Sequence, residues 1–173
     1  MSDSKKFRAI NIAVLTISDT RTEDDDKSGK LLVELLTQAG HISVFKKIVP
    51  DDIYAIRATV SNWIASSEVD AIVTTGGTGV TGRDGTPEAI QPLLDKEIEG
   101  FGEIFRAISY TEIHTSSIQS RALAGVANGT YIFSLPGSSG ACKTAWLSII
   151  SQQLDIRTRP CNLAILMPRL LEK

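Results

Sequence analysis

Strand-like and helix-like segments alternate along this chain, and this alternation limits the possible folds more than any other feature. Short apolar segments rich in β-branched residues lie at 9–17, 42–49, 69–75 and 131–135. Longer segments with helical spacing of apolar residues lie between them. This pattern predicts an α/β fold with three layers, α/β/α, around a mostly parallel sheet. In such folds the loops at the carboxyl ends of the strands meet at one edge, where ligands bind.

Five segments are expected to be helical. They are the leucine-striped run that ends near Gly40, then 53–64, 86 to about 94, 100–113 and 141–154. Thr86 is expected to be an N-cap with Pro87 as the first helical residue. The acidic run Glu23–Asp26 is expected to stabilise a helix start through the helix dipole. Asn128-Gly129 predicts a turn, while the pattern leaves the structure of 122–126 open.

The composition describes an ordinary globular chain of 173 residues with a net charge of −2. Residues 1–173 are expected to form a single domain. The charge provides no broad attraction to nucleic acid or to an anionic membrane. The polar N-terminus lacks a signal-peptide core, which favours a cytoplasmic location with both cysteines reduced. Only two histidines are present, and neither has metal-ligand spacing or a credible place in a nucleophilic triad.

The segment Thr74-Thr75-Gly76-Gly77-Thr78-Gly79 follows a buried-looking strand and is itself followed by Asp84 and Thr86-Pro87-Glu88. Glycine-rich backbone can present N–H groups to an anion, and a nearby carboxylate can hold a cation. The order therefore predicts a site for a phosphate-bearing ligand. Residues 77–82 also match G-x-G-x-x-G, but the expected helix start at Thr86 is too late for a dinucleotide fold.

A second small-residue loop, Pro136-Gly137-Ser138-Ser139-Gly140, precedes the last expected helix. Its free N–H groups could bind one phosphate, or it could serve only as a turn into a capped helix. Residues 137–144 nearly match a P-loop, except that Cys142 replaces its second glycine. Four arginines are possible anion contacts, although solvated surface positions are the commoner role: Arg106, Arg121, Arg157 and Arg159.

Three aspartates follow expected strands: Asp19, Asp51 and Asp84. Each could serve turn or cap chemistry. Three of them at one sheet edge beside two glycine loops favour a cation site, and Mg²⁺ often binds one or two carboxylates together with substrate phosphates. Asp52 competes with Asp51 for this role, and spacing alone does not choose between them.

At these positions the chain resembles the molybdenum-cofactor biosynthesis family that includes the MoaB and Mog proteins. The matching segments are Thr16–Asp19, Asp26–Gly29, Val49–Asp51, Thr74–Gly79 with Asp84 and Thr86–Glu88, Gly100–Glu103, Ser120–Ala122 and Leu135–Ser138. They span nearly the whole chain. The ending Arg157–Asn162 is more similar to the MoaB branch than to the Mog branch.

The resemblance implies a molybdopterin-binding fold and a Mg²⁺-dependent step in which ATP transfers AMP to the terminal phosphate of molybdopterin. It implies that Asp51 and Asp84 serve catalysis and hold the metal. It also implies a set of residues that bind substrate and phosphate: Ser18, Asp19, Thr75, Gly76, Gly77, Thr78, Gly79, Pro136, Gly137 and Ser138. Homotrimers or homohexamers are expected.

The sequence leaves two other functions open. A molybdopterin-binding or carrier protein would need the glycine loops but not the magnesium site. An assembly module would use its surface only for oligomerisation and would bind neither ligand. Adenylyl transfer is favoured because it needs positioning and charge neutralisation more than a protein nucleophile.

Overall fold

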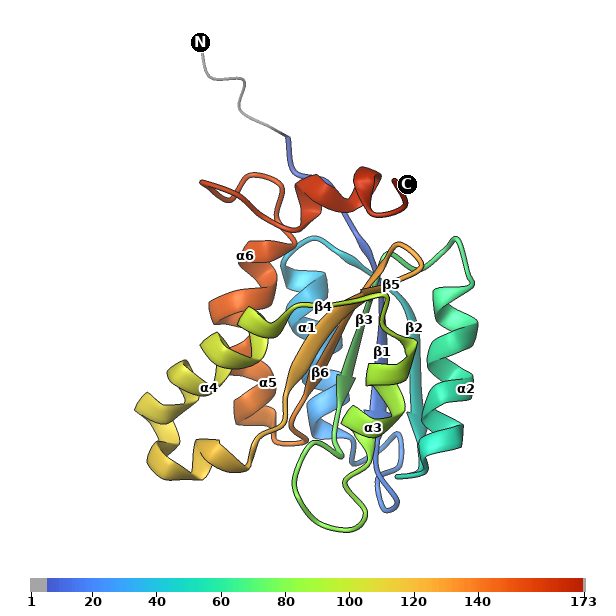
Figure 1. The fold of residues 1–173 in the computed structure, drawn as a ribbon, viewed down its shortest axis with the longest axis vertical. Helices are drawn as coiled ribbons and strands as arrows, with labels where there is room; N and C mark the ends of the chain where they lie inside the picture. Colours follow the sequence, from blue (N-terminus) through green and yellow to red (C-terminus); the bar gives the residue numbers. More distant parts are fainter. Residues whose placement is uncertain (1–5, 173) are drawn as a thin grey trace.

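A computed structural model describes residues 6–172, and within this range a single mixed sheet organises the fold (Figure 1). Its strands are β1 (Asn11–Ile17), β2 (Ile42–Val49), β3 (Ala71–Thr75), β4 (Lys96–Glu97), β5 (Leu123–Ala127) and β6 (Thr130–Leu135). The spatial order is β2-β1-β3-β6-β5-β4. Strands β2, β1, β3 and β6 are parallel, whereas β5 and β4 are antiparallel to their neighbours. The predicted α/β class with a mostly parallel sheet is confirmed.

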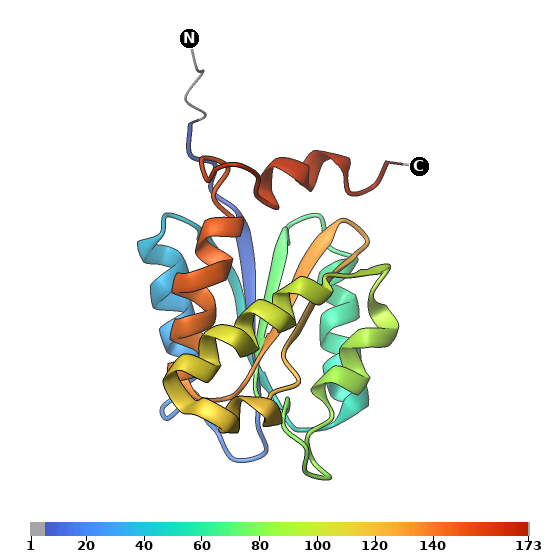
Figure 2. The ribbon, with the colours of Figure 1, turned by 60° about the vertical axis from the view of Figure 1, so that its left-hand side comes forward.

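Helices cover both faces of the sheet (Figures 1 and 2). One face packs against α1 (Lys27–Gln38), α4 (Glu99–Ile113) and α5 (Ser139–Ala145), and the other against α2 (Ile53–Ile64) and α3 (Thr86–Ile90). Shorter helical segments complete the described chain: 3₁₀ helices η1 (Gln91–Leu93), η2 (His114–Gln119) and η4 (Ala164–Arg169), the π-helical turn η3 (Trp146–Ile150) and α6 (Ser151–Gln153). Each face has its own hydrophobic core, and Trp63 and Trp146 are buried in them as core residues.

Most predicted elements lie where the sequence places them. β2 and α2 have the predicted bounds, and the helical run after residue 138 reaches Gln153 with a π turn in its middle. The segment left open at 122–126 forms β5, which pairs antiparallel with β6. The turn between them has φ angles of 46° at Asn128 and 80° at Gly129, as a two-residue hairpin turn requires.

Two predictions about helix starts need correction: the acidic run acts at the start of α1 through Asp26 alone, and Thr86 is not an N-cap. In the acidic run, Asp26 is the N-cap of α1, and the first turn of α1 contains no acidic residue. Asp26 is fully buried, and it accepts hydrogen bonds from Thr16 Oγ1 and the Gly29 N–H and pairs with Lys46 at 2.8 Å. Burial alone would raise the pKa of Asp26, but Lys46 and the hydrogen bonds outweigh burial and lower it. Asp26 alone of the run therefore stabilises the helix start, as its N-cap, and it is at the same time a buried partner of Lys46.

The second correction concerns Thr86. Gly85, not Thr86, is the N-cap of α3. The Thr86 hydroxyl donates instead to the Gly76 carbonyl at 2.8 Å. A backbone acceptor in the preceding loop competes successfully for this hydroxyl, so Thr86 ties α3 to the glycine loop.

The strand order fixes where a ligand site can form. β1 is followed by β2 on one side, and α2 then returns the chain to β3 on the other side of β1. Loops that leave adjacent parallel strands in opposite directions open a crevice at their carboxyl ends. In the described part of the chain, no helix is long and apolar enough to cross a membrane.

Candidate functional site

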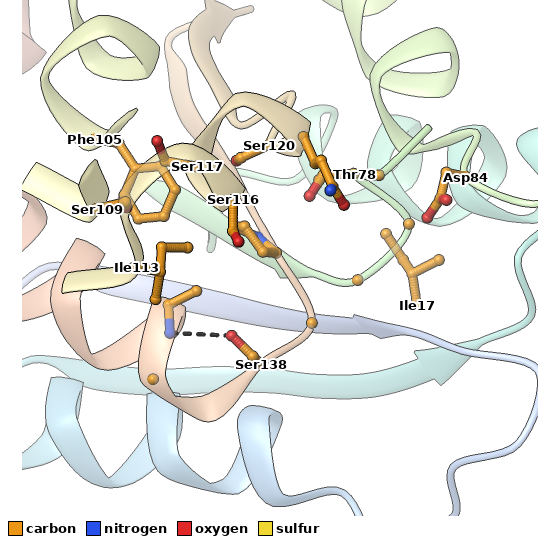
Figure 3. A pocket seen from close by; sticks show the side chains of 18 of the residues that line it. Ile17, Thr78, Asp84, Phe105, Ser109, Ile113, Ser116, Ser117, Ser120 and Ser138 are labelled. Carbon is orange, nitrogen blue, oxygen red and sulfur yellow. Dashed lines mark hydrogen bonds between the residues drawn. The ribbon is translucent and has the colours of Figure 1, made fainter. Parts of the chain in front are cut away.

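A cavity of about 580 Å³ opens at this crevice (Figure 3), a size suited to a small-molecule ligand. The ends of β1, β3 and β6 supply one wall, and α4 with η2 supplies the other. The lining residues are Ile17, Asp51, Gly76, Gly77, Thr78, Gly79, Arg83, Asp84, Phe105, Ser109, Glu112, Ile113, Ser116, Ser117, Gln119, Ser120, Pro136, Gly137, Ser138, Gly140 and Ala141. Both predicted glycine loops and two of the three predicted aspartates thus lie on one cavity.

The first glycine loop has a backbone that only glycine adopts easily. Gly76 and Gly77 have φ angles of +108° and +65°, in the region that side chains disfavour. A Cβ on Gly76 would lie 2.1 Å from the Ile17 carbonyl oxygen. The Gly76 N–H already donates to the Leu135 carbonyl at 3.0 Å, so this N–H stabilises the loop and is not available to a ligand.

Asp51 and Asp19 join the ends of β2 and β1. The Asp19 N–H donates to Asp51 Oδ2 at 3.1 Å, and the Asp51 N–H donates to Asp19 Oδ1 at 3.0 Å. Arg83 also donates to Asp19 Oδ2, from Nε at 2.9 Å and from Nη2 at 2.6 Å. Hydrogen bonding to Arg83 lowers the pKa of Asp19, whereas burial, followed by the charge of Asp19, raises the pKa of Asp51.

The structure also separates Asp51 from Asp52. Asp52 is the N-cap of α2, and its carboxylate accepts the Ala55 N–H at 2.8 Å. Asp51 lines the cavity. The neighbouring aspartates therefore divide the two roles that the sequence left open, one at the helix cap and one at the cavity.

Asp84 lies beside Gly79, whereas Asp51 lies beside Gly77, so the two carboxylates accompany different residues of the same glycine loop. Its Oδ2 accepts hydrogen bonds from the Thr81 N–H at 2.8 Å and the Thr81 hydroxyl at 2.6 Å. These bonds, the hydroxyl bond above all, lower the pKa of Asp84. Asp84 is therefore an anchored anion, and its charge contributes to the raised pKa of Asp51.

Arg121 holds this loop in shape. Its Nε donates to the Gly79 carbonyl and its Nη2 to the Asp84 carbonyl, both at 2.7 Å. Its Nη1 pairs with Glu88, and its backbone N–H donates to the Thr78 carbonyl at 3.0 Å. One guanidinium thus joins both ends of the loop to the start of α3. The sequence predicts Arg121 only as a possible anion contact and not as a support of this loop.

Three predicted binding residues do not line the cavity. Ser18 accepts N–H bonds from Thr20 and Arg21 within its own turn, and Asp19 is paired with Arg83. Thr75 is buried, and its hydroxyl donates to the Pro136 carbonyl at 3.0 Å. Thr75 therefore supports the second glycine loop from within the sheet, whereas Ser18 and Asp19 line a separate hollow of the surface beside Lys46 and Lys47.

The second glycine loop contributes Pro136, Gly137 and Ser138 to the cavity. Ser138 is the N-cap of α5, and its hydroxyl accepts the Ala141 N–H at 3.2 Å. Both cysteines are free; Cys142 is buried beneath this loop, where burial raises its pKa to about 11. This loop is therefore both a helix cap and a lining segment.

The sequence does not predict the wall made by α4 and η2. It adds Phe105, Ser109, Glu112, Ile113, Ser116, Ser117, Gln119 and Ser120. The sequence signal for it is weak: small polar residues repeat at helical spacing at Ser109, Ser116 and Ser120, but serine at such spacing also suits an exposed helix face. Only packing of α4 over the end of the sheet makes this segment part of a cavity.

The acidic residues suit a magnesium ion shared with substrate. Within residues 6–172, no cluster of three or more His, Cys, Asp or Glu side chains could enclose a metal. Asp51 and Asp84 nevertheless face one cavity, and Mg²⁺ commonly takes one or two carboxylates and completes its shell with phosphate oxygens and water. The donor set fits a substrate-bound ion better than a permanently enclosed one.

The fold and this cavity define a class: α/β proteins with a small-molecule site at the carboxyl edge of a mostly parallel sheet, lined by two glycine loops and by carboxylates. A family profile described as "Probable molybdopterin binding domain" matches residues 13–155. The chain belongs to this molybdopterin-binding family of molybdenum-cofactor biosynthesis proteins, as the motif resemblance implied.

Individual relatives support this family assignment. The chain is 57% identical over 159 residues to molybdenum cofactor biosynthesis protein B of Escherichia coli K12, a match that covers 92% of this chain and 94% of that protein. A crystal structure of a molybdenum cofactor biosynthesis protein B superposes with a TM-score of 0.84 at 48% identity, covering 87% of this chain and 94% of the other. The tungsten cofactor synthesizing protein MoaB from Pyrococcus furiosus has a TM-score of 0.77 at 43% identity, covering 84% and 92%.

Proposed function

We propose that this protein binds molybdopterin and transfers AMP from ATP to its terminal phosphate, within molybdenum-cofactor biosynthesis. One observation carries the proposal: two carboxylates, Asp51 and Asp84, flank a glycine loop on a single cavity. The phosphate of molybdopterin and the triphosphate of ATP both need hydrogen-bond donors and charge neutralisation. The glycine loop would supply backbone donors, and the two carboxylates would hold the cation that neutralises the charge. The family profile, whose description names molybdopterin binding, supports the choice of molybdopterin.

In this reaction an oxygen of the molybdopterin phosphate attacks the α-phosphate of ATP, and pyrophosphate leaves. The N–H groups of the first glycine loop, beginning at Gly77, would orient the acceptor phosphate. The loop after β6, at Gly137 and Ser138, would hold the other ligand. No protein nucleophile is required, because the acceptor phosphate itself forms the new bond.

Asp51 and Asp84 would hold a Mg²⁺ ion together with phosphate oxygens. When bound, the ion would neutralise charge on the triphosphate. Asp51 must be ionised for this role, although burial and Asp19 raise its pKa. Thr81 and Arg121 would keep Asp84 fixed beside the loop.

The direct test mixes the protein with molybdopterin, ATP and Mg²⁺ and measures adenylylated molybdopterin and pyrophosphate. Asp51→Asn and Asp84→Asn should each abolish most turnover while circular dichroism and thermal unfolding stay close to wild type. Asp52→Asn is the matched control, because asparagine caps a helix as well as aspartate does. Absence of turnover in the wild-type protein would refute the proposal.

A non-catalytic molybdopterin-binding or carrier protein is the second candidate. One observation favours it: Asp84 Oδ2 is already satisfied by both donors of Thr81, as a purely structural aspartate would be. Tight molybdopterin binding without ATP consumption, equal in the presence and absence of Mg²⁺, would select this function.

A homotrimer or homohexamer of single-domain chains completes the proposal. Large apolar side chains are exposed on the outer surface of α4 and η2, namely Ile104, Tyr110 and Ile118. Such exposed side chains suit contact with another protein surface. Analytical ultracentrifugation of the wild-type chain tests this assembly, and a monomer would contradict it.

A further inference from the structure

The two ends of the cavity differ in chemistry. Thr78 and Asp84 lie at one end, beside the glycine loop, whereas Phe105, Ser109 and Ile113 lie at the other end, on α4 (Figure 3). The first end suits phosphates and a cation. The second end combines apolar side chains with a few hydroxyls, which suits a flat heterocycle with a polar edge.

Glu112 brings a carboxylate to this second end. Of the three acidic residues that line the cavity, Asp51 and Asp84 belong to the glycine-loop end, and only Glu112 comes from α4. Glu112 follows Ser109 by one helical turn, so both side chains lie on the same side of α4. The proposed phosphate and magnesium chemistry gives Glu112 no role.

The Glu112 carboxylate is held in place from α5. The hydroxyl of Thr144 lies 3.0 Å from Glu112 Oε1 and 2.9 Å from Oε2, and Thr144 is buried. One hydroxyl proton satisfies only a small part of the acceptor capacity of a carboxylate. The remaining lone pairs are available to donors from a ligand, and the carboxylate does not have to be ordered when the ligand binds.

Resting on the proposed function, we propose that Glu112 is a specificity-determining residue that recognises the pyrimidine edge of the pterin. A 2-amino-4-oxo pyrimidine presents an amino group and a ring N–H side by side, and a carboxylate accepts both. Adenine presents its amino group beside a ring nitrogen that is itself an acceptor, which a carboxylate repels. Glu112 therefore admits the pterin to the α4 end and directs the adenine of ATP elsewhere.

Two synthetic probes test this directly: 6-hydroxymethylpterin phosphate and the corresponding lumazine phosphate, in which a carbonyl replaces the 2-amino group. The wild-type protein should bind the pterin roughly tenfold or more tightly than the lumazine, the discrimination typical of one bidentate pair. Glu112→Gln should remove most of this preference, because an amide offers one acceptor and one donor. Fluorescence titration without ATP gives both dissociation constants.

Two further variants separate recognition from structure. Glu103→Gln, on an exposed part of α4 outside the cavity, should keep the wild-type preference. Thr144→Val keeps the Glu112 carboxylate but removes its anchor, and it should reduce the preference without abolishing it. Glu112→Asp should also reduce the preference, because its carboxylate reaches one methylene less far.

The ratio of the two dissociation constants cancels the phosphate contribution and involves no AMP transfer, so it is independent of the proposed catalysis. If the wild-type protein transfers no AMP but still shows a pterin preference that depends on Glu112, the proposed function is refuted and this inference stands. An unchanged preference in a folded Glu112→Gln protein, equal wild-type affinity for the two probes, or no binding of either would overturn it.

Discussion

Asp19 and Asp51 each donate their backbone N–H to the carboxylate of the other, at 3.1 and 3.0 Å. This reciprocal pair joins the carboxyl ends of β1 and β2 and brings two negative charges close together. Arg83 neutralises Asp19 from outside. The pair thus places Asp51 on the cavity with a pKa above its ordinary value, owing to burial and the neighbouring charge.

Replacing Asp19 should lower the pKa of Asp51. Asp19→Asn removes a negative charge, so the ionised form of Asp51 becomes easier to form. If ionised Asp51 is needed for AMP transfer, the acid limb of the pH–rate profile should move to lower pH, and NMR titration of the Asp51 carboxyl should move in the same direction. Asp24→Asn, an exposed acid in the same loop between β1 and α1, is the control. A shift to higher pH would contradict this account.

Gly76→Ala should destabilise the fold by about 2 kcal/mol or more, because alanine is strained at φ +108° and its Cβ would meet the Ile17 carbonyl. Gly82 is the matched control in the same loop, since a Cβ there would meet nothing within 4 Å. Gly82→Ala should change the free energy of unfolding by no more than about 0.5 kcal/mol. Urea denaturation measures both, and similar values would show that the loop adapts.

Arg121→Met should weaken ligand binding more than it weakens folding. Three acceptors on the glycine loop and α3 lose their donor, yet the side chain is 33% exposed and water can replace part of the loss. We expect about a tenfold rise in the dissociation constant for molybdopterin, the equivalent of one charged hydrogen bond. Arg121→Lys should recover only part of it, since an ammonium cannot reproduce the forked contact. Arg169→Met, far from the cavity, should bind as wild type does.

His41 should make stability depend on pH near neutrality. It is buried, its Nδ1 accepts the Ile10 N–H at 3.2 Å, and burial lowers its pKa despite the opposing charge of Asp155. Because the unfolded state binds the proton more readily, stability present above a pH of about 6.5 should fall as the pH drops below it.

Thermal unfolding at pH 7.5 and pH 5 measures this effect. Acidification should lower the Tm of wild type more than that of His41→Asn, in which an amide oxygen can accept the same N–H. His114→Gln, at an exposed position, should follow wild type. An equal decrease in Tm on acidification in all three proteins would exclude His41 as the cause.

Sequence reasoning located the elements that depend on neighbours along the chain. The bounds of β2 and α2, the Asn128-Gly129 turn and the glycine loop after β3 were all predicted, because apolar periodicity and turn chemistry are local. The helix-start role predicted for Glu23–Asp26 holds only for Asp26, and the N-cap role predicted for Thr86 was wrong, because the Gly76 carbonyl binds its hydroxyl. The single-domain organisation and the catalytic roles of the aspartates stay predictions.

By itself, the sequence determined the α/β class, the family and the fact that two glycine loops end parallel strands. The tertiary structure alone decided that Asp51 and not Asp52 faces the cavity, that Ser18, Asp19 and Thr75 do not line it, and that α4 closes it with Glu112. The physical reason is the distance along the chain over which each feature is determined. Periodicity and capping are set by residues a few positions apart, whereas a cavity wall depends on how a helix packs over strands far away in the chain.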